Sequence, residues 1–183
     1  MTEFDQLKKV MEFGSKEEKI KAIESLSNSS DPKTISLLVA ALDDKDIQVR
    51  GEAFSSLVLN ENDISSILVD ALKSTSKNVR GYSTLVLANR NDKNAVPYIV
   101  KLTDDESAMV RSCAVGALGF LKAGEALDAI RKCLEDPNIE VKKSAIKSAI
   151  DVGDRDLLSK LDKLGQVNDP EIKNLLILAK NNL

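Results

Sequence analysis

Histidine and tryptophan are absent from the 183 residues, and their absence excludes several classes of function. Without histidine the chain has no Ser-His-Asp or Cys-His nucleophile, no histidine general base and no histidine-ligated zinc or iron. Aromatic residues make up only 3% of the sequence, which is too few for surfaces that stack nucleic-acid bases. The two cysteines, Cys113 and Cys133, form no CxxC pair and lie at the spacing of helix cores. We therefore expect buried thiols, no metal, no cofactor and no enzymatic activity.

Charge and hydrophobic runs restrict the partners further. The formal net charge is −3, which argues against a general binder of phosphate backbones. Residues 1–10 lack the apolar core of a secretory signal, and the longest uncharged stretch, Ser112–Leu121, is shorter than the roughly 20 apolar residues of a membrane span. Apolar residues make up 43% of the sequence and charged residues 30%, as in globular proteins. We expect a cytoplasmic protein that does not contact a membrane.

A motif of the form cap-x-x-Val-basic-x-x-small recurs every 30 or 31 residues. The clear copies are DIQVRGEA at 46–53, SKNVRGYS at 76–83, SAMVRSCA at 107–114 and NIEVKKSA at 138–145, with weaker copies at 15–22 and 169–176. Their basic residues are Lys19, Arg50, Arg80, Arg111, Lys142 and Lys173. This regularity predicts six repeats, at about 1–28, 29–60, 61–90, 91–122, 123–153 and 154–183.

Each predicted repeat contains two helices. The residue four positions before every motif cation is Ser, Asp or Asn, the types that cap helix N-termini, and apolar residues then follow at helical spacing, as in Val49, Ala53 and Leu57. The first helix of the second repeat begins with the cap and proline Asp31-Pro32. The first helix of the sixth repeat has the apolar stripe Leu157, Leu158, Leu161 and Leu164. The pattern predicts an all-α protein, a right-handed α-solenoid of about six two-helix repeats in a single domain over residues 1–183.

These units resemble HEAT repeats of the short, armadillo-like kind first described in phycobilisome lyases. The resemblance is carried by units such as DPKTISLLVAALDDKDIQVRGEAFSSL and by the acid–base pairs Asp44/Arg50, Asp105/Arg111 and Asp136/Lys142; the third repeat departs from it with Ser74 in the acidic place. It implies a HEAT-like solenoid fold and leaves the function open. Related hydroxylases hold iron with histidines that this chain lacks.

The motif cations and the acidic residues before them are the most regular polar feature of the sequence. One interpretation is a track for anions; the other is a structural ladder, in which each cation bonds the Asp six residues earlier and the turn of the adjacent repeat. We favour the structural ladder because the chain is acidic and the pairs are already complementary. Its predicted members are Arg50, Arg80, Arg111, Lys142, Asp44, Asp105 and Asp136.

A second stripe, one, five and nine residues after each cation, should face the concave surface of the repeats. Its central part is small and apolar, with Gly51, Ser55, Gly81, Ser112 and Gly116 beside large apolar residues. One hypothesis is a groove for a helix or peptide of another protein; the alternative is packing between neighbouring repeats. The candidate partner-binding residues are Leu59, Tyr82, Leu85, Phe120 and Glu52.

We therefore predict a non-enzymatic scaffold that binds another, unidentified protein in its concave groove. The alternatives are an accessory subunit or chaperone of an enzyme, as the lyase resemblance implies, and a weak nucleic-acid contact at Lys142, Lys143 and Lys147. Nucleic acid is the less favoured partner. The apolar run 175–178 in the last predicted helix raises a further alternative, weak self-association through the C-terminal repeat.

Overall fold

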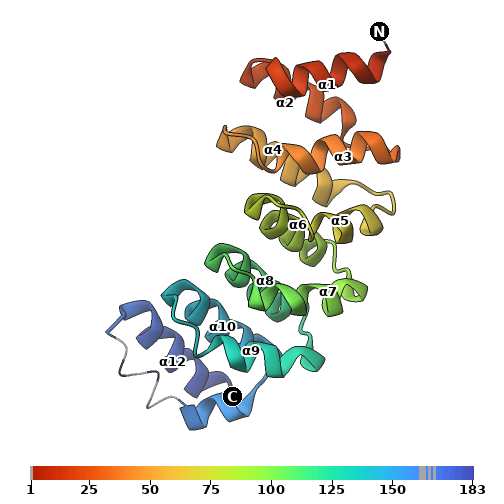
Figure 1. The fold of residues 1–183 in the computed structure, drawn as a ribbon. Helices are drawn as coiled ribbons and strands as arrows, with labels where there is room; N and C mark the ends of the chain where they lie inside the picture. The colour runs from red at the N-terminus through yellow and green to blue at the C-terminus, as the bar shows by residue number, and fades with distance from the viewer. Residues whose placement is uncertain (1, 161–163, 165, 167) are drawn as a thin grey trace. The chain divides into compact units, whose positions relative to one another are not determined.

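The computed structural model describes residues 2–160, 164, 166 and 168–183, and the regular structure in these residues is entirely helical (Figure 1). The all-α repeat class is thus confirmed. Two compact units divide the chain, unit 1 at Met1–Arg90 and unit 2 at Asn91–Leu183. Their boundary coincides with the predicted border between the third and fourth repeats, and the single-domain organisation stays a prediction. No helix among the described residues has the length and apolar character needed to cross a membrane.

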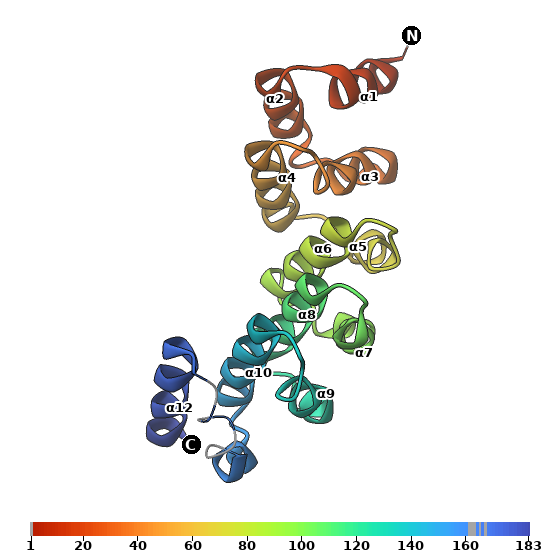
Figure 2. The same ribbon diagram turned by 60° about the vertical axis from the view of Figure 1, so that its left-hand side comes forward.

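Unit 1 consists of three helix pairs. They are α1 (Glu3–Phe13) with α2 (Lys16–Leu26), α3 (Pro32–Ala41) with α4 (Ile47–Leu59), and α5 (Ser65–Ala71) with α6 (Lys77–Asn89). The second helices α2, α4 and α6 pack in series, as do the first helices α1, α3 and α5 (Figure 2). This two-layer arrangement puts the stripe of every second helix on a common side of unit 1.

Unit 2 repeats the pairing, and the first helices of its first two repeats are each preceded by a 3-10 turn. Its elements are η1 (Lys93–Ala95), α7 (Val96–Lys101), η2 (Leu102–Asp104), α8 (Ala108–Phe120), η3 (Gly124–Ala126), α9 (Leu127–Cys133), α10 (Ile139–Val152), η4 (Arg155–Lys160) and α12 (Pro170–Asn182). The second helices α8 and α10 make the most extensive contact of the unit, and α10 packs against α12. Gly153 ends α10 in the left-handed conformation that glycine adopts without strain, with φ 83°.

The predicted caps are confirmed. The capping residues of the second helices are Ser15, Asp46, Ser76, Ser107, Asn138 and Asp169. In all of these except Ser107 the side-chain oxygen accepts a hydrogen bond from a first-turn N–H. Asp31 also caps α3, which begins at Pro32, and accepts from the N–H of Thr34 at 2.9 Å. The 31-residue periodicity therefore identifies real helix starts.

The core follows the predicted helical spacing. Val49, Ala53, Leu57, Val110, Ala114 and Leu118 are all fully buried. In the sixth repeat Leu157 and Leu164 are buried, but the prediction that Leu158 is a core residue is wrong, because its side chain is 38% exposed. Leu161 lies outside the described residues.

The contact between α8 and α10 requires glycine at position 119. A Cβ atom on Gly119 would lie 2.6 Å from the Cα of Ser148, where atoms cannot approach without movement of the backbone. Ser148 is itself fixed, because it is buried and its hydroxyl donates to the carbonyl of Val115 at 2.8 Å. Unit 2 is therefore closely packed at its centre.

Candidate functional site

The motif arginines bind backbone carbonyls in their own repeat. Nη1 of Arg50 donates to the carbonyl oxygens of Asp44 at 2.8 Å and Lys45 at 3.3 Å. Arg80 and Arg111 make the same pair of bonds to the carbonyls six and five residues earlier. The prediction that these cations bond the acidic side chain six residues earlier is thus corrected. Because the partner is a backbone carbonyl, the bond does not need an acidic residue there and persists where Ser74 replaces it.

The acidic side chains bind the cation of the preceding repeat, as the structural-ladder interpretation predicts for the turn of the adjacent repeat. Nζ of Lys19 lies 2.6 Å from Oδ2 of Asp44, and Arg111 binds both carboxylate oxygens of Asp136 at 2.7 and 3.0 Å. Arg111 thereby lowers the pKa of Asp136, to which Lys142 also contributes electrostatically. Burial of Asp44 opposes its ionisation, but the hydrogen bonds from Lys19 and from the N–H of Asp46, together with the charges of Lys19 and Lys45, lower its pKa overall. These residues connect consecutive repeats.

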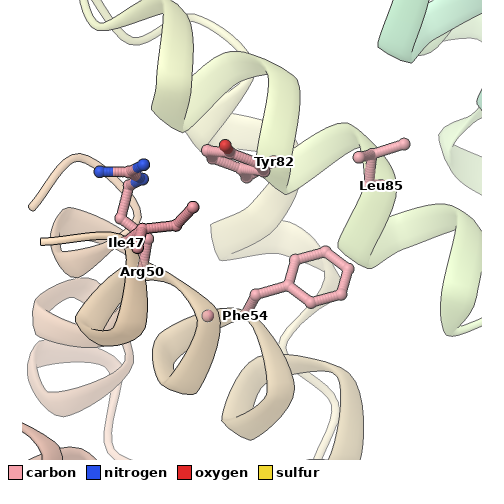
Figure 3. A pocket seen from close by; sticks show the side chains of 6 residues that line it. Ile47, Arg50, Phe54, Tyr82 and Leu85 are labelled. Carbon is pink, nitrogen blue, oxygen red and sulfur yellow. The ribbon is translucent and has the colours of Figure 1, made fainter.

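A pocket of about 310 Å³ opens between α4 and α6 in unit 1; its lining residues are Ile47, Arg50, Gly51, Phe54, Tyr82 and Leu85. Figure 3 shows these side chains on α4 and α6, with Tyr82 extending from α6 toward Ile47 and Arg50 on α4. Ile47 is 72% exposed, while Tyr82 and Leu85 are half-buried. This site, which we call the Ile47 pocket, is an apolar depression with one guanidinium at its border.

Gly51 contributes to this pocket by having no side chain. It lies inside α4, where glycine costs up to about 1 kcal/mol relative to alanine. A Cβ atom there would find no neighbour within 4 Å, so packing does not explain the glycine. Its position in the lining of the Ile47 pocket explains the glycine, because a side chain there would fill part of the pocket.

A second pocket of about 310 Å³ lies on the other side of α4; its lining residues are Glu24, Ser27, Asn28, Glu52, Ser55, Ser56, Leu59 and Glu61. It contains two of the predicted partner-binding residues, Glu52 and Leu59, and Leu59 is 76% exposed. The three glutamates make this second pocket acidic. Predicted residues of unit 1 therefore divide between two neighbouring pockets, Tyr82 and Leu85 in one and Leu59 and Glu52 in the other.

Phe120, the remaining predicted partner-binding residue, belongs to unit 2. It is 61% exposed at the end of α8 and lines neither of the pockets beside α4 described above. In the same stripe Ser112 and Gly116 are half-buried, and Ser112 and Ser144 share a hydrogen bond of 2.8 Å between α8 and α10. The stripe of unit 2 thus combines contact between helices with one exposed aromatic ring.

Sequence reasoning missed Ile47, Phe54 and the position of Arg50 beside them. Ile47 lies four residues before Gly51 and Phe54 three after it, so all three share one face of α4. The predicted stripe begins at the residue after the cation, which is one helical turn too late to include Ile47. Extending the stripe by one turn toward the helix N-terminus would have included it.

The polar network of Asn60, Asn62 and Arg90 was also missed. Asn60 is buried and its amide donates to the carbonyls of Ser27 and Ser29, both at 2.9 Å. Arg90 in turn donates to the carbonyls of Asn60 and Asn62. These bonds fix the loops at one end of the repeats of unit 1.

Charged side chains of unit 2 are extensively paired. Lys143 lies within 3.2 Å of carboxylate oxygens of Glu140, Asp169 and Glu171, which raise its pKa. Arg131 binds both oxygens of Asp154 at 2.9 and 2.6 Å. Lys143, one of the three lysines of the predicted nucleic-acid contact, is therefore already paired with carboxylates and is a poor ligand for phosphates.

Neither thiol is suited to catalysis. Burial raises the pKa of both Cys113 and Cys133 to about 11, so each is a neutral thiol at pH 7. Among the residues that the structure describes, no group of three or more Cys, Asp or Glu side chains is arranged to hold a metal ion.

The C-terminal helix leaves part of its apolar run exposed. Leu176 is buried, while Ile177 is 59% and Leu178 46% exposed. Self-association through this helix stays a prediction.

Comparison with known proteins identifies the repeats. Residues 65–146 match the family model for HEAT repeats. These residues are similar to HEAT repeats. No curated protein matches the sequence significantly.

Solved structures extend the likeness of the HEAT-like fold to most of the chain. The complex of CpcE and CpcF of phycocyanin lyase from Nostoc sp. PCC7120 matches with a TM-score of 0.70 and 19% identity, over 82% of this chain and 99% of that chain. A designed armadillo repeat protein in complex with the peptide (KR)4 has a TM-score of 0.59 and 22% identity, over 99% of each chain. Human deoxyhypusine hydroxylase has a TM-score of 0.54 and 15% sequence identity, over 97% of this chain and 83% of that chain. The predicted HEAT-like fold is confirmed, and folds of this kind commonly form protein-binding scaffolds.

Proposed function

We propose that the chain is a non-enzymatic scaffold that binds a helix or extended peptide of another protein on the second-helix face of unit 1. An apolar side chain of the partner enters the Ile47 pocket. The observation that carries the proposal is the pocket itself, an apolar depression bordered by an isoleucine that is 72% exposed. Burying one leucine-sized side chain contributes about 1.5–3 kcal/mol. Contacts along neighbouring turns of α4 and α6 would supply the rest of the affinity.

Two further observations support this proposal. Gly51 sits inside α4 at a cost to helix stability that packing does not explain, and it keeps the pocket open. A designed protein of the same fold was solved in complex with a peptide. The acidic second pocket beside Leu59 offers a place for a basic residue of the same partner.

The proposal is tested by selecting a displayed library of random twelve-residue peptides on the full chain. We expect enriched peptides to share an apolar residue and to lose binding at least about tenfold to a Gly51→Leu variant, whose side chain fills the pocket. The matched control is Gly116→Leu on α8, because a Cβ there also has no neighbour within 4 Å. Circular dichroism melts establish that both variants fold. Peptides that bind wild type and Gly51→Leu equally would contradict the proposal, as would a library without enrichment.

A subunit that pairs with another protein in an enzyme is the second candidate. Its support is the likeness to the phycocyanin lyase complex, with a TM-score of 0.70. Visible absorbance of the purified protein would favour it over the simple scaffold. We also propose a cytoplasmic location, which the two free cysteines support.

A further inference from the structure

The connections between repeats are interrupted at one place in unit 1. In the regular pattern the cation of one repeat binds the acidic residue six positions before the next cation, as in Lys19–Asp44 and Arg111–Asp136. For Arg50 the corresponding residue is Ser74. Ser74 is in the equivalent structural place, because its carbonyl accepts from Arg80 at 2.9 Å and its hydroxyl accepts from the N–H of Ser76 at 3.2 Å. Position 74 therefore lacks the carboxylate that the regular pattern has there.

Arg50 keeps two donor nitrogens available as a result. Its Nη1 binds the carbonyls of Asp44 and Lys45, whereas its Nε and Nη2 have no hydrogen-bond acceptor within the part of the chain that the structure describes. In Arg111 the same two nitrogens hold the carboxylate of Asp136. Arg50 thus presents the edge of the guanidinium that binds a carboxylate in a bidentate manner.

The acidic side chains of the neighbouring turn are occupied elsewhere. Asp43 accepts from the amide of Asn78 at 2.8 Å, Asp44 accepts from Lys19, and Asp46 caps α4 by accepting from the N–H of Gln48 at 2.7 Å. No carboxylate among the described residues therefore compensates Arg50. The two carbonyl bonds meanwhile hold its guanidinium in place, so that little side-chain entropy is lost when a ligand binds.

Arg50 also borders the Ile47 pocket, opposite Tyr82 (Figure 3). We infer that the partner supplies the missing carboxylate: an Asp or Glu side chain binds Nε and Nη2 of Arg50 while an adjacent apolar side chain of the same segment fills the pocket. Serine is shorter than aspartate and leaves room for this group beside Ser74. This inference rests on the proposed function and adds the chemistry of the partner, an acidic residue next to an aromatic or aliphatic one.

A pair of small ligands tests this inference. The probes are 3-phenylpropionate and its amide, titrated at millimolar concentrations into the full chain and followed by NMR of the Ile, Leu and Tyr side chains. We expect both to perturb Ile47, Tyr82 and Leu85, and the acid to bind about fivefold more tightly than the amide. The chain carries a net charge of −3, so non-specific attraction would not favour the acid.

The decisive variant is Ser74→Asp, which restores the carboxylate found in the other repeats without removing Arg50. We expect it to abolish the preference for the acid and to leave binding of the amide unchanged. Ser66→Asp, on the exposed surface of α5, is the control with the same change in charge and should keep the preference. Equal binding of acid and amide, or a preference for the acid that persists in Ser74→Asp, would overturn the inference. Neither result would contradict the proposed binding pocket. Failure of both ligands to perturb the pocket would overturn the proposed function as well.

Discussion

Units 1 and 2 are built from the same repeat but differ in how they use their charges. In unit 2 Arg111 binds Asp136, Arg131 binds Asp154, and Lys143 is surrounded by three carboxylates. In unit 1 Arg50 makes the same carbonyl bonds as Arg111 and lines an apolar pocket, but Ser74 stands at the position that corresponds to Asp136. The comparison indicates that a repeat array can keep its fold when one inter-repeat ion pair is omitted, because the arginine–carbonyl bonds are retained.

The two units also use glycine in opposite ways. Gly119 in unit 2 allows α8 and α10 to approach, and its Cβ would lie 2.6 Å from Ser148. Gly51 in unit 1 has open space around it and lines the Ile47 pocket. Glycine therefore permits close packing of α8 against α10 in unit 2, whereas in unit 1 it leaves the Ile47 pocket unfilled.

The largest effect is expected from Gly119→Ala, because its Cβ would overlap Ser148. We expect the free energy of unfolding to fall by about 3 kcal/mol, as in overpacked cores. Gly116→Ala on the same helix should raise it by up to about 1 kcal/mol, since alanine favours helix and no atom lies within 4 Å. Urea unfolding followed by circular dichroism measures both. Similar values for the two variants would show that α8 and α10 are not in close contact.

Asp136→Asn should have the next largest effect, about 2 kcal/mol of destabilisation at pH 7, because it leaves Arg111 without its carboxylate. Arg111 lowers the pKa of Asp136 below its ordinary value of 3.8 in the folded state, so the unfolded state takes up the proton first as the pH falls. This stabilisation is therefore complete above the ordinary pKa and is lost as the pH falls through the lower folded value.

The corresponding measurement is the melting temperature as a function of pH. Below about pH 5 it should fall less steeply in Asp136→Asn than in wild type, because the variant no longer contains the titrating group. Asp151→Asn, an exposed site on α10, should leave both the stability and the slope nearly unchanged. Parallel curves for wild type and Asp136→Asn would show that the pair does not contribute to stability.

Ser74→Asp should have the smallest effect and the opposite sign. Completing the pair with Arg50 is expected to stabilise unit 1 by about 1 kcal/mol at low salt, and less at high salt because the pair is partly exposed. Thermal melts of Ser74→Asp and Ser66→Asp at two salt concentrations measure this gain. A loss of stability specific to Ser74→Asp would mean that Ser74 does not correspond to Asp44 and Asp136.

Local and periodic features of this chain could be predicted from its sequence. The caps Ser15, Asp46, Ser76 and Asn138 and the buried stripe of Val49, Ala53 and Leu57 follow from helix chemistry within one turn, and the 31-residue period places them in repeats. The exposure of Leu59 and Phe120 followed from the same geometry, whereas Leu85, which the same stripe predicts to be exposed, is half-buried.

Features that depend on contacts between repeats were harder to predict. The sequence pairs Asp44 with Arg50, but the carboxylate binds Lys19, 25 residues earlier, and Arg50 takes the carbonyl instead. Sequence spacing alone does not distinguish a bond to a side chain from a bond to the backbone of the same residue. The Ile47 pocket was missed for a similar reason, since two of its six lining residues, Tyr82 and Leu85, come from the next repeat.

Methyl NMR of the full chain with a selected peptide tests the central claim most directly. If unit 1 binds the partner through the Ile47 pocket, the methyl signals of Ile47 and Leu85 will shift on titration and those of Ile177 and Leu178 will not. Shifts confined to Ile177 and Leu178, with Ile47 and Leu85 unchanged, would contradict this account and place the binding surface on α12.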